Sequence, residues 1–330
     1  MPRAVISDTL GPLENYSVRD YDPGPPGPGQ VRIAVRAAGV SFVDVLNATG
    51  RYQGRAPVPF IPGSEFAGVV EALGEGVTQF SPGQAVMSGG WGGAFAEAAL
   101  VDADTVHAMP AGMDFVQAAV FRVSALTAWH ALVDRAQLQP GETLLVLGAG
   151  GATGYAAVQI GAWLGARVIA SASTAGKRGL ALHGGAETAV DARSTNWREA
   201  VQAANQGRPL DVVFDPVGGE ATERAFRCLG FAGRHLVVGF PGGISALPTN
   251  LPLLKGASLV GVNLQAQSIA APRSASANLE RLVDLAGKGL FWPVVADTWP
   301  LEQFAAAMAA VERGTSEGRI VITMDSVAGA

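Results

Sequence analysis

The chain has 330 residues and a formal net charge of −5, which argues against a general nucleic-acid binder because such proteins need a basic face. Hydrophobic residues make up 48% and charged residues 15%, enough to bury a large core in two domains. Cys228 is the single cysteine, which excludes a disulfide within the chain and a structural zinc site of four thiolates.

The first residues, MPRAVISDTLG, contain no basic segment followed by an apolar one, so the N-terminus resembles that of a cytoplasmic protein. Residues 143–166 carry no charge and are long enough to span a bilayer. Glycines gather near the start of this run, however, and a second apolar strand follows it. We therefore expect no membrane segment.

Short strands dominate the first third of the chain. Residues 3–7 and 31–36 are predicted strands separated by the loop DPGPPGPGQ, and further strands are predicted at 65–75 and 83–88. Short strands with frequent turns predict a barrel-like β domain up to about residue 120.

Strands alternate with helices after this point. Strands are predicted at 144–148, 167–171, 187–190, 211–215 and 235–239, and helices at 153–164, 176–183, 196–205 and 219–229. This alternation predicts a doubly wound parallel sheet with helices on both faces, an α/β fold.

The C-terminal part follows a polar stretch that begins after residue 264. A helix near 277–288, the strand WPVVAD, the helix LEQFAAAMAAVE and the strand RIVITM are too few elements for a third domain. We therefore predict that residues 1–123 and 265–330 form one domain and that residues 124–264 form the other.

A glycine-rich turn lies between the strand LLVL and the next helix. Gly148, Gly151 and Gly154 are spaced three apart, with Ala152 and Thr153 between the last two. The first amides of a helix have no partner and the helix dipole favours negative charge there. Gly151 would let a diphosphate approach the backbone, and Gly154 would let the helix pack on the sheet. The sequence thus predicts a dinucleotide site, with a tight turn that binds no ligand as the alternative.

The acidic residue of an NAD site is missing. Such sites usually place Asp or Glu about 20 residues after the loop, but no acidic residue occurs between Glu142 and Glu187. The second strand instead leads into hydroxyl and cationic side chains, namely Ser171, Ser173, Thr174, Lys177 and Arg178. These suit the 2′-phosphate of NADPH (NADP+), which a carboxylate would repel. We expect Lys177 to contact it; for Arg178 a contact and a solvated helix start are both open.

Several motifs resemble one known family. They are VSFVDVLNATGRYQG, PFIPGSEFAGVVEALGEGV, LTAWHAL, AVQIGAWLGARVIASAS and DVVFDPVGG, in this order up to about residue 262. Together they resemble the medium-chain dehydrogenase/reductase superfamily, and within it the zinc-free quinone oxidoreductases related to zeta-crystallin. The resemblance implies a GroES-like β-barrel domain plus a Rossmann domain.

The resemblance also bears on metal binding. Ser41 stands where the zinc branch carries Cys, and Ser64 stands where it carries the His of a Gly-His-Glu motif. A serine hydroxyl is a poor zinc ligand beside a thiolate. The other histidines show no ligand spacing, and we interpret His235, in an apolar strand, as a hydrogen-bonded core residue. We expect no metal site.

Without a Lewis acid, the resemblance implies reduction of an already polarised acceptor, a quinone or an α,β-unsaturated carbonyl compound (enone). Tyr52 matches a tyrosine that lines the active site in the family and would donate to the carbonyl oxygen that gains charge. Ser41 stands where many members have Asn near the substrate. Tyr52 and Ser41 are therefore the candidate catalytic residues, although Tyr52 could also be a loop residue with its hydroxyl in water.

Four more residues are expected at the cofactor through the resemblance: Thr127, Gly239, Phe240 and Asn263. Thr127 could instead bond to its own helix, Phe240 could be a core residue and Asn263 a turn residue. The chain departs from the family at Arg122, where a cation lies among apolar residues. Arg122 could bind an anionic substrate, but we favour an ion pair with a neighbouring strand or loop.

Two other functions stay open. One is a 2-enoyl thioester (enoyl-CoA type) reductase, and the other is a non-catalytic NADPH-binding or structural protein. The expected partners are a small-molecule substrate and a second copy of the chain, since the apolar strand SLVGV could pair with its twin in a homodimer. No nucleic acid or membrane partner is expected.

Overall fold

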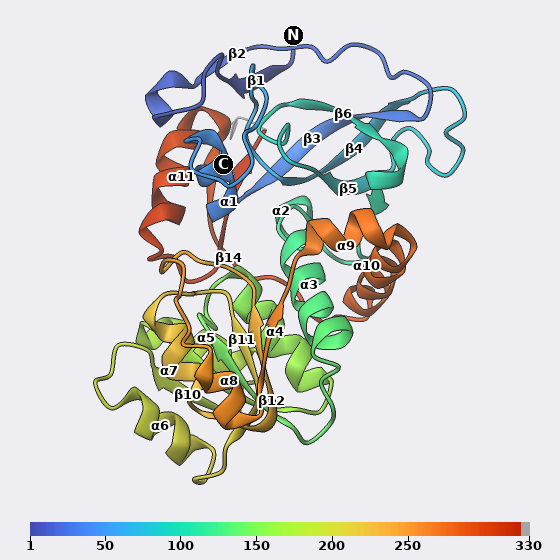
Figure 1. Cartoon of the computed structure of the whole chain (residues 1–330). Coiled ribbons are helices and arrows are strands. Elements are labelled where there is room, and N and C mark those ends of the chain that lie inside the picture. Colours follow the sequence, from blue (N-terminus) through green and yellow to red (C-terminus); the bar gives the residue numbers. More distant parts are fainter. Residues whose placement is uncertain (325–330) are drawn as a thin grey trace. The chain divides into compact units, whose positions relative to one another are not determined.

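The computed structural model describes residues 1–324 (Figure 1), which fall into two compact units. The first unit contains Met1–Arg122 and the chain from Val283 onward, and the second contains Val123–Leu282. The second boundary between the units thus lies within the helix α10 (Pro272–Gly287), later than the predicted boundary at residue 264. Helix α9 (Leu264–Ala270) and most of α10 belong to the second unit. Residues 325–330, assigned above to the first domain, lie outside the described residues.

The first unit is built on one large sheet. Among residues 1–324 this sheet has seven strands, with the order β14-β15-β3-β4-β5-β7 and with β6 paired to β3. The strands are β3 (Gln30–Val40), β4 (Glu65–Leu73), β5 (Ala85–Gly89), β6 (Ala98–Asp102), β7 (His107–Ala108), β14 (Val295–Pro300) and β15 (Arg319–Thr323). A separate pair joins β1 (Arg3–Ile6) to β2 (Ser17–Asp20). The GroES-like fold is confirmed.

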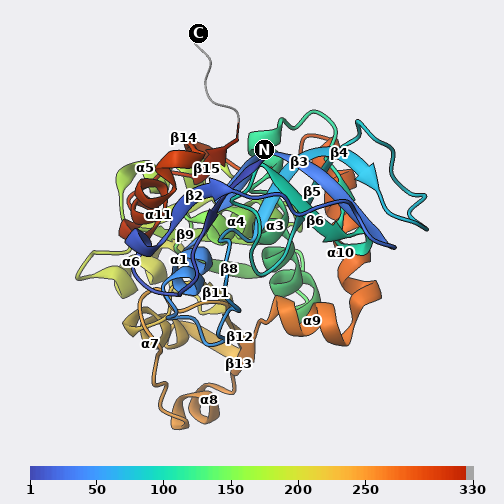
Figure 2. The same ribbon diagram turned by 90° about the horizontal axis from the view of Figure 1, so that it is seen from above.

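The C-terminal segment rejoins the first unit, as predicted. Strand β15 pairs antiparallel with β3, Ile320 opposite Val40. The helix α11 (Phe304–Arg313) packs beside β14 and β15 (Figure 2). The other helices of this unit are α1 (Phe42–Ala48) and α2 (Phe115–Ala118).

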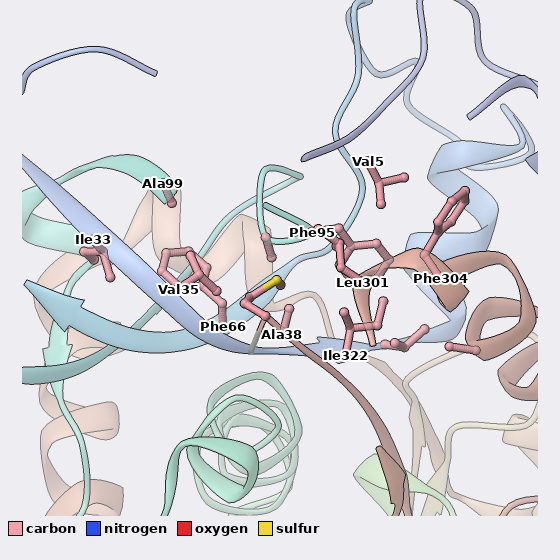
Figure 3. Packing of buried hydrophobic residues seen from close by; sticks show 14 of the residues in the cluster. Val5, Ile33, Val35, Ala38, Phe66, Phe95, Ala99, Leu301, Phe304 and Ile322 are labelled. Carbon is pink, nitrogen blue, oxygen red and sulfur yellow. The ribbon is translucent and has the colours of Figure 1, made fainter. Parts of the chain in front are cut away.

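The core of the first unit draws on residues far apart in the sequence. Alternate residues of β3 are buried along its first half. Ile33 and Val35 of β3 lie in one apolar cluster with Phe66 of β4, and Phe304 and Ile322 from the end of the chain join it (Figure 3). Burial of such side chains stabilises a fold by about 1.5–3 kcal/mol each, so this cluster holds the C-terminal segment to the N-terminal strands.

The second unit is the predicted doubly wound domain. Its six parallel strands have the order β10-β9-β8-β11-β12-β13. They are β8 (Thr143–Leu147), β9 (Arg167–Ala172), β10 (Thr188–Asp191), β11 (Leu210–Asp215), β12 (Leu229–Val237) and β13 (Ser258–Gly261). The order reverses between β8 and β11, and ligands of such sheets bind at the carboxyl ends of the strands at this point.

Helices connect these strands. They are α3 (Arg122–Trp129), α4 (Ala152–Trp163), α5 (Ala175–His183), α6 (Trp197–Ala204), α7 (Glu220–Phe226) and α8 (Asn250–Lys255). The charge-free run 143–166 is thus a strand followed by a helix. No helix in the described part of the chain combines the length and the apolar character that a membrane span requires.

Several short elements were not predicted. They include α2, α8, α9, a wide helical turn at His130–Arg135 and single turns at Leu13–Asn15, Ala103–Thr105 and Leu301–Gln303. Helix α8 is only six residues long and contains Pro252, and it ends at Gly256 in the left-handed conformation (φ 57°). Such a segment is too short for helical periodicity to be visible.

Candidate functional site

The glycine-rich turn has the geometry that its spacing predicts. Strand β8 ends at Leu147, Gly148 adopts a positive φ of 58°, and α4 begins at Ala152. A Cβ at Gly154 would collide with the carbonyl oxygen of Gly148. Gly154 is therefore needed for the close contact between α4 and the end of β8.

The N-terminus of α4 is bare backbone. Gly151 is its N-cap and has no side chain to accept a hydrogen bond from the first turn. The first residues, Ala152, Thr153 and Gly154, hold the amides that a helix cannot satisfy internally. Because the helix dipole adds positive potential here, this turn fits a diphosphate group.

Lys177 lies directly against this turn. A Cβ built on Gly150 would be 2.5 Å from the Cβ of Lys177. The base of the Lys177 side chain therefore lies against the glycine-rich turn. The position is fixed by α5, whose N-cap Thr174 accepts a hydrogen bond from the amide of Lys177 (3.1 Å). Half-buried Ser173 precedes this cap. The structure therefore brings Lys177 and the glycine turn together.

Ser171 and Arg178 have partners within the protein. The buried Ser171 Oγ accepts a hydrogen bond from Nε1 of Trp197 (2.8 Å), which does not favour the predicted contact with a cofactor. Arg178 Nη1 is 3.1 Å from Oδ2 of Asp191. Asp191 ends β10, the strand beside β9, and it comes four residues after Glu187, the end of the acid-free interval.

Asp215 is the centre of a buried network that the sequence analysis missed. Its Oδ1 accepts from the amides of Val217 (2.9 Å) and Gly218 (2.8 Å). Its Oδ2 accepts from Thr222 Oγ1 (2.6 Å) and faces His235 Nε2 at 3.0 Å. Burial acts to raise the pKa of Asp215, but these hydrogen bonds outweigh it and the pKa is lowered. The interpretation of His235 as a bonded core residue is confirmed.

This network holds the loops after β11 and β12 together. Gly218 has a positive φ of 76°, and a Cβ there would lie 3.1 Å from the Cα of Phe240 and 3.2 Å from the carbonyl oxygen of Gly239. The side chain of Phe240 is 43% exposed, so it is not a core residue. Both loops follow carboxyl ends of strands, on the same sheet edge as the glycine turn.

Asn263 and Thr127 lie on helices of the second unit. Asn263 is the N-cap of α9, and its Oδ1 accepts from the amide of Ala266 (2.9 Å). Thr127 is half-buried on α3. Their contacts with a cofactor remain predictions.

In the first unit, Ser41 and Tyr52 flank the helix α1. Ser41 is its N-cap, and the Ser41 Oγ donates to Asp44 Oδ2 (2.7 Å) and accepts from the Asp44 amide (3.2 Å). Tyr52 follows the other end of the helix, and its ring centroid lies 5.6 Å from that of Trp91. In the described part of the chain the Tyr52 hydroxyl has no hydrogen-bond partner, so it is available to donate.

Asp44 carries a perturbed carboxyl group. It is 2% exposed, and burial raises its pKa to about 6, although hydrogen bonds from Ser41 and Ser64 act in the opposite direction. The charge of Glu65 adds to the increase. Glu65 is itself buried and accepts from Nη2 of Arg319 (2.6 Å).

This donor set does not fit zinc. Ser41 and Ser64 both bond to Asp44, Glu65 bonds to Arg319, and none of them offers a thiolate or an imidazole. Residues 1–324 contain no group of three or more His, Cys, Asp or Glu side chains placed to hold a metal ion.

Comparison with known proteins now decides the family. A family model described as "Alcohol dehydrogenase GroES-like domain" matches residues 27–111, and one described as "Zinc-binding dehydrogenase" matches residues 152–283. Quinone oxidoreductase-like protein 2 of Mus musculus is 34% identical over 97% of this chain and 91% of its own length. The chain belongs to the medium-chain dehydrogenase/reductase superfamily.

Solved structures of this superfamily agree. A quinone oxidoreductase of Pseudomonas syringae pv. Tomato DC3000 superposes with a TM-score of 0.88 at 25% identity, covering 98% of this chain and 100% of the other. The CurK enoyl reductase gives a TM-score of 0.89 at 25% identity, with 98% and 99% covered. The chain is therefore an oxidoreductase of this superfamily. Serines 41 and 64 lie outside the segment that the zinc-binding dehydrogenase model matches.

Proposed function

We propose that the protein reduces quinones or α,β-unsaturated carbonyl compounds by hydride transfer from NADPH, without zinc. The observation that carries the proposal is the position of Lys177 against the bare glycine turn at the start of α4. A diphosphate on these amides would have a cation beside it, and the chain in this region has hydroxyls where an NAD site has its carboxylate.

The preference for NADPH also takes account of Asp191. A carboxylate near the 2′-phosphate would oppose binding, but Asp191 is paired with Arg178 at 3.1 Å. The pair brings no net charge to the end of β9 and β10. Lys177 then supplies the charge that selects a phosphate.

Bound NADPH would supply the hydride. The residues of the chain would hold the cofactor and polarise the carbonyl group of the acceptor. The amides of Ala152, Thr153 and Gly154 would bind the diphosphate. The Tyr52 hydroxyl would donate to the carbonyl oxygen of the acceptor, where negative charge grows as the hydride arrives. An electron-poor quinone or enone is reduced in this way without a Lewis acid.

A 2-enoyl thioester reductase is the second candidate. The superposition on the CurK enoyl reductase favours it, and the chemistry at the reacting carbon is the same conjugate hydride addition. The two differ in the acceptor, a free quinone or enone in one case and a thioester in the other.

Two measurements test these functions together. Fluorescence titration with NADPH is expected to show binding at micromolar concentration, and absence of binding would leave only a non-catalytic role. NADPH oxidation is then followed with a panel of quinones, enones and enoyl thioesters, before and after dialysis against a chelator. Activity that disappears on dialysis and returns with zinc would contradict the zinc-free mechanism.

Lys177→Ala is expected to weaken NADPH binding about 10-fold or more, because one charge-assisted hydrogen bond contributes about 1.5–3 kcal/mol. The affinity for NADH should fall less than about 2-fold, because NADH lacks the 2′-phosphate and so cannot form this hydrogen bond. The dissociation constants of both cofactors are compared by titration. Lys288→Ala, which removes a lysine paired with Asp284 on exposed surface, is the control. An equal loss for both cofactors would contradict the phosphate contact.

Tyr52→Phe removes only the hydroxyl group. We expect kcat to fall about 100- to 1,000-fold, the range for loss of one donor to a developing oxyanion. NADPH affinity and the melting temperature should stay unchanged, because this hydroxyl has no hydrogen-bond partner in the described chain. Steady-state kinetics with a quinone check this. An unchanged kcat would restrict Tyr52 to packing against Trp91.

We further propose a homodimer formed through β13, an edge strand of the six-stranded sheet. Exposed apolar residues lie there and beside it, on β12, α8 and β13: Phe231, Leu253, Leu254 and Leu259. Helix α8 packs beside β12, as Figure 2 shows. Open strand edges with such patches favour pairing. Light scattering is expected to give twice the mass of one chain, and Leu259→Lys should shift the mass toward that of a monomer.

A further inference from the structure

Arg122 is a cation without a matching anion. It is the first residue of α3 and is mostly buried, between the fully buried Phe121 and half-buried Val123. Its Nε is buried and has no hydrogen-bond partner. None of the ion pairs in residues 1–324 includes it, so the expected ion pair with a neighbouring strand or loop is not formed. A buried charge without a partner costs free energy.

The acid whose charge acts on Arg122, Glu65, is already paired with Arg319. The charge of Glu65 acts on Arg122 and raises its pKa, but burial lowers it by more. Glu65 Oε1 accepts from Nη2 of Arg319 at 2.6 Å, and both side chains are almost fully buried. Asp44, the other buried acid of this cluster, is bonded to Ser41 and Ser64 instead. These hydrogen bonds therefore leave the positive charge of Arg122 without a carboxylate partner.

The cluster also contains the predicted substrate residue of the first unit. The charge of Glu65 acts on Arg122, Glu65 follows Ser64 in the chain, Ser64 bonds to Asp44, and Asp44 bonds to Ser41. A guanidinium binds a carboxylate through two parallel hydrogen bonds, one of which can come from Nε. The free Nε of Arg122 has the chemistry for one of the two.

We propose that Arg122 binds the carboxylate of an acidic substrate, so that the preferred acceptors are α,β-unsaturated ketones that carry a carboxylic acid. This substrate class rests on the proposed function. Arg122 contributes no step to the hydride transfer; it orients the acceptor and selects its charge.

The test compares two acceptors that differ by one charge, 4-oxo-4-phenylbut-2-enoate and its methyl ester. The wild-type protein should reduce the acid with the higher kcat/KM. Arg122→Met should lower kcat/KM about 10- to 100-fold for the acid, the range for a lost charge-assisted hydrogen bond, and leave the ester nearly unchanged. Arg122→Lys should restore part of the loss. Arg313→Met, which removes an exposed cation of the same unit, should change neither acceptor.

A binding measurement separates this proposal from the proposed function. Calorimetric titration with the saturated acid 4-oxo-4-phenylbutanoate and with its methyl ester needs no turnover. Tighter binding of the acid that is lost in Arg122→Met supports the carboxylate site even if no acceptor is reduced. Equal binding of acid and ester by the wild-type protein, or an equal loss of both in Arg122→Met and Arg122→Lys, would overturn it.

Discussion

Gly154→Val is expected to reduce NADPH affinity by at least about 100-fold, because losing two hydrogen bonds to the charged diphosphate, about 1.5–3 kcal/mol each, costs that much. The new Cβ cannot occupy its place beside the carbonyl oxygen of Gly148, so α4 must move away from the end of β8. The amides of Ala152 and Thr153 move with it. Overpacking of this kind also costs about 1–3 kcal/mol of stability. Fluorescence titration and thermal unfolding of the same preparation measure both effects.

Gly179→Ala is the matched control. Gly179 lies within α5, near Lys177, but a Cβ there meets nothing within 4 Å. Alanine favours a helix over glycine by about 0.5–1 kcal/mol, so this variant should bind NADPH like the wild-type protein and unfold at a slightly higher temperature. If Gly154→Val kept its affinity while remaining folded, the diphosphate would not lie at this turn and the proposed function would lose its main support.

Local patterns predicted most of the second unit. The segment from Leu144 to Gly154 contains a strand, a turn and a helix start within a few residues, and each signal depends on neighbours in the chain. The return of β15 to β3 was also predictable, because the last elements were too few to form a core of their own. Helix α1 could have been placed from its capping box, in which Ser41 is followed three residues later by Asp44.

Contacts between distant residues were not predictable in this way. Ser171 was predicted as a cofactor ligand from its place near the end of the second strand, and its hydroxyl accepts a hydrogen bond from Trp197, 26 residues later. The same limit applies to the network of Asp215, whose partner His235 lies on the next strand. Strand order and register decide such contacts, and neither is encoded in a short window of sequence.

Arg122 is a further example. The sequence showed a cation among apolar residues, and the common outcome for such a residue is an ion pair. Whether Glu65 is available depends on Arg319, which comes from the other end of the chain and occupies it. The charge balance of this cluster therefore follows from the return of β15 and not from the residues around Arg122.

Asp44→Asn is expected to reveal a pH-dependent cost of the buried carboxyl group. Burial raises its pKa from the ordinary value of 3.8 to about 6, so between these pH values the folded protein holds a proton that the unfolded chain has released. The contribution of Asp44 to stability is therefore highest below pH 3.8, falls as the pH rises toward 6 and is then constant. The shift corresponds to about 3 kcal/mol. The unfolding free energy of the variant, relative to that of the wild-type protein, should rise by about this amount between acidic and slightly alkaline pH.

Urea unfolding over this pH range measures the difference, with Asp114→Asn as the control. Asp114 caps α2 as Asp44 supports the cap of α1, with a hydrogen bond from the Gln117 amide (2.7 Å), but it is exposed. This variant shows how loss of an exposed capping carboxylate changes the unfolding free energy. A difference for Asp44→Asn that stays constant with pH would mean that Asp44 ionises as readily in the folded protein as in the unfolded chain. A full negative charge would then persist beside Ser41 at acidic pH, where it would repel the carboxylate that Arg122 is proposed to bind.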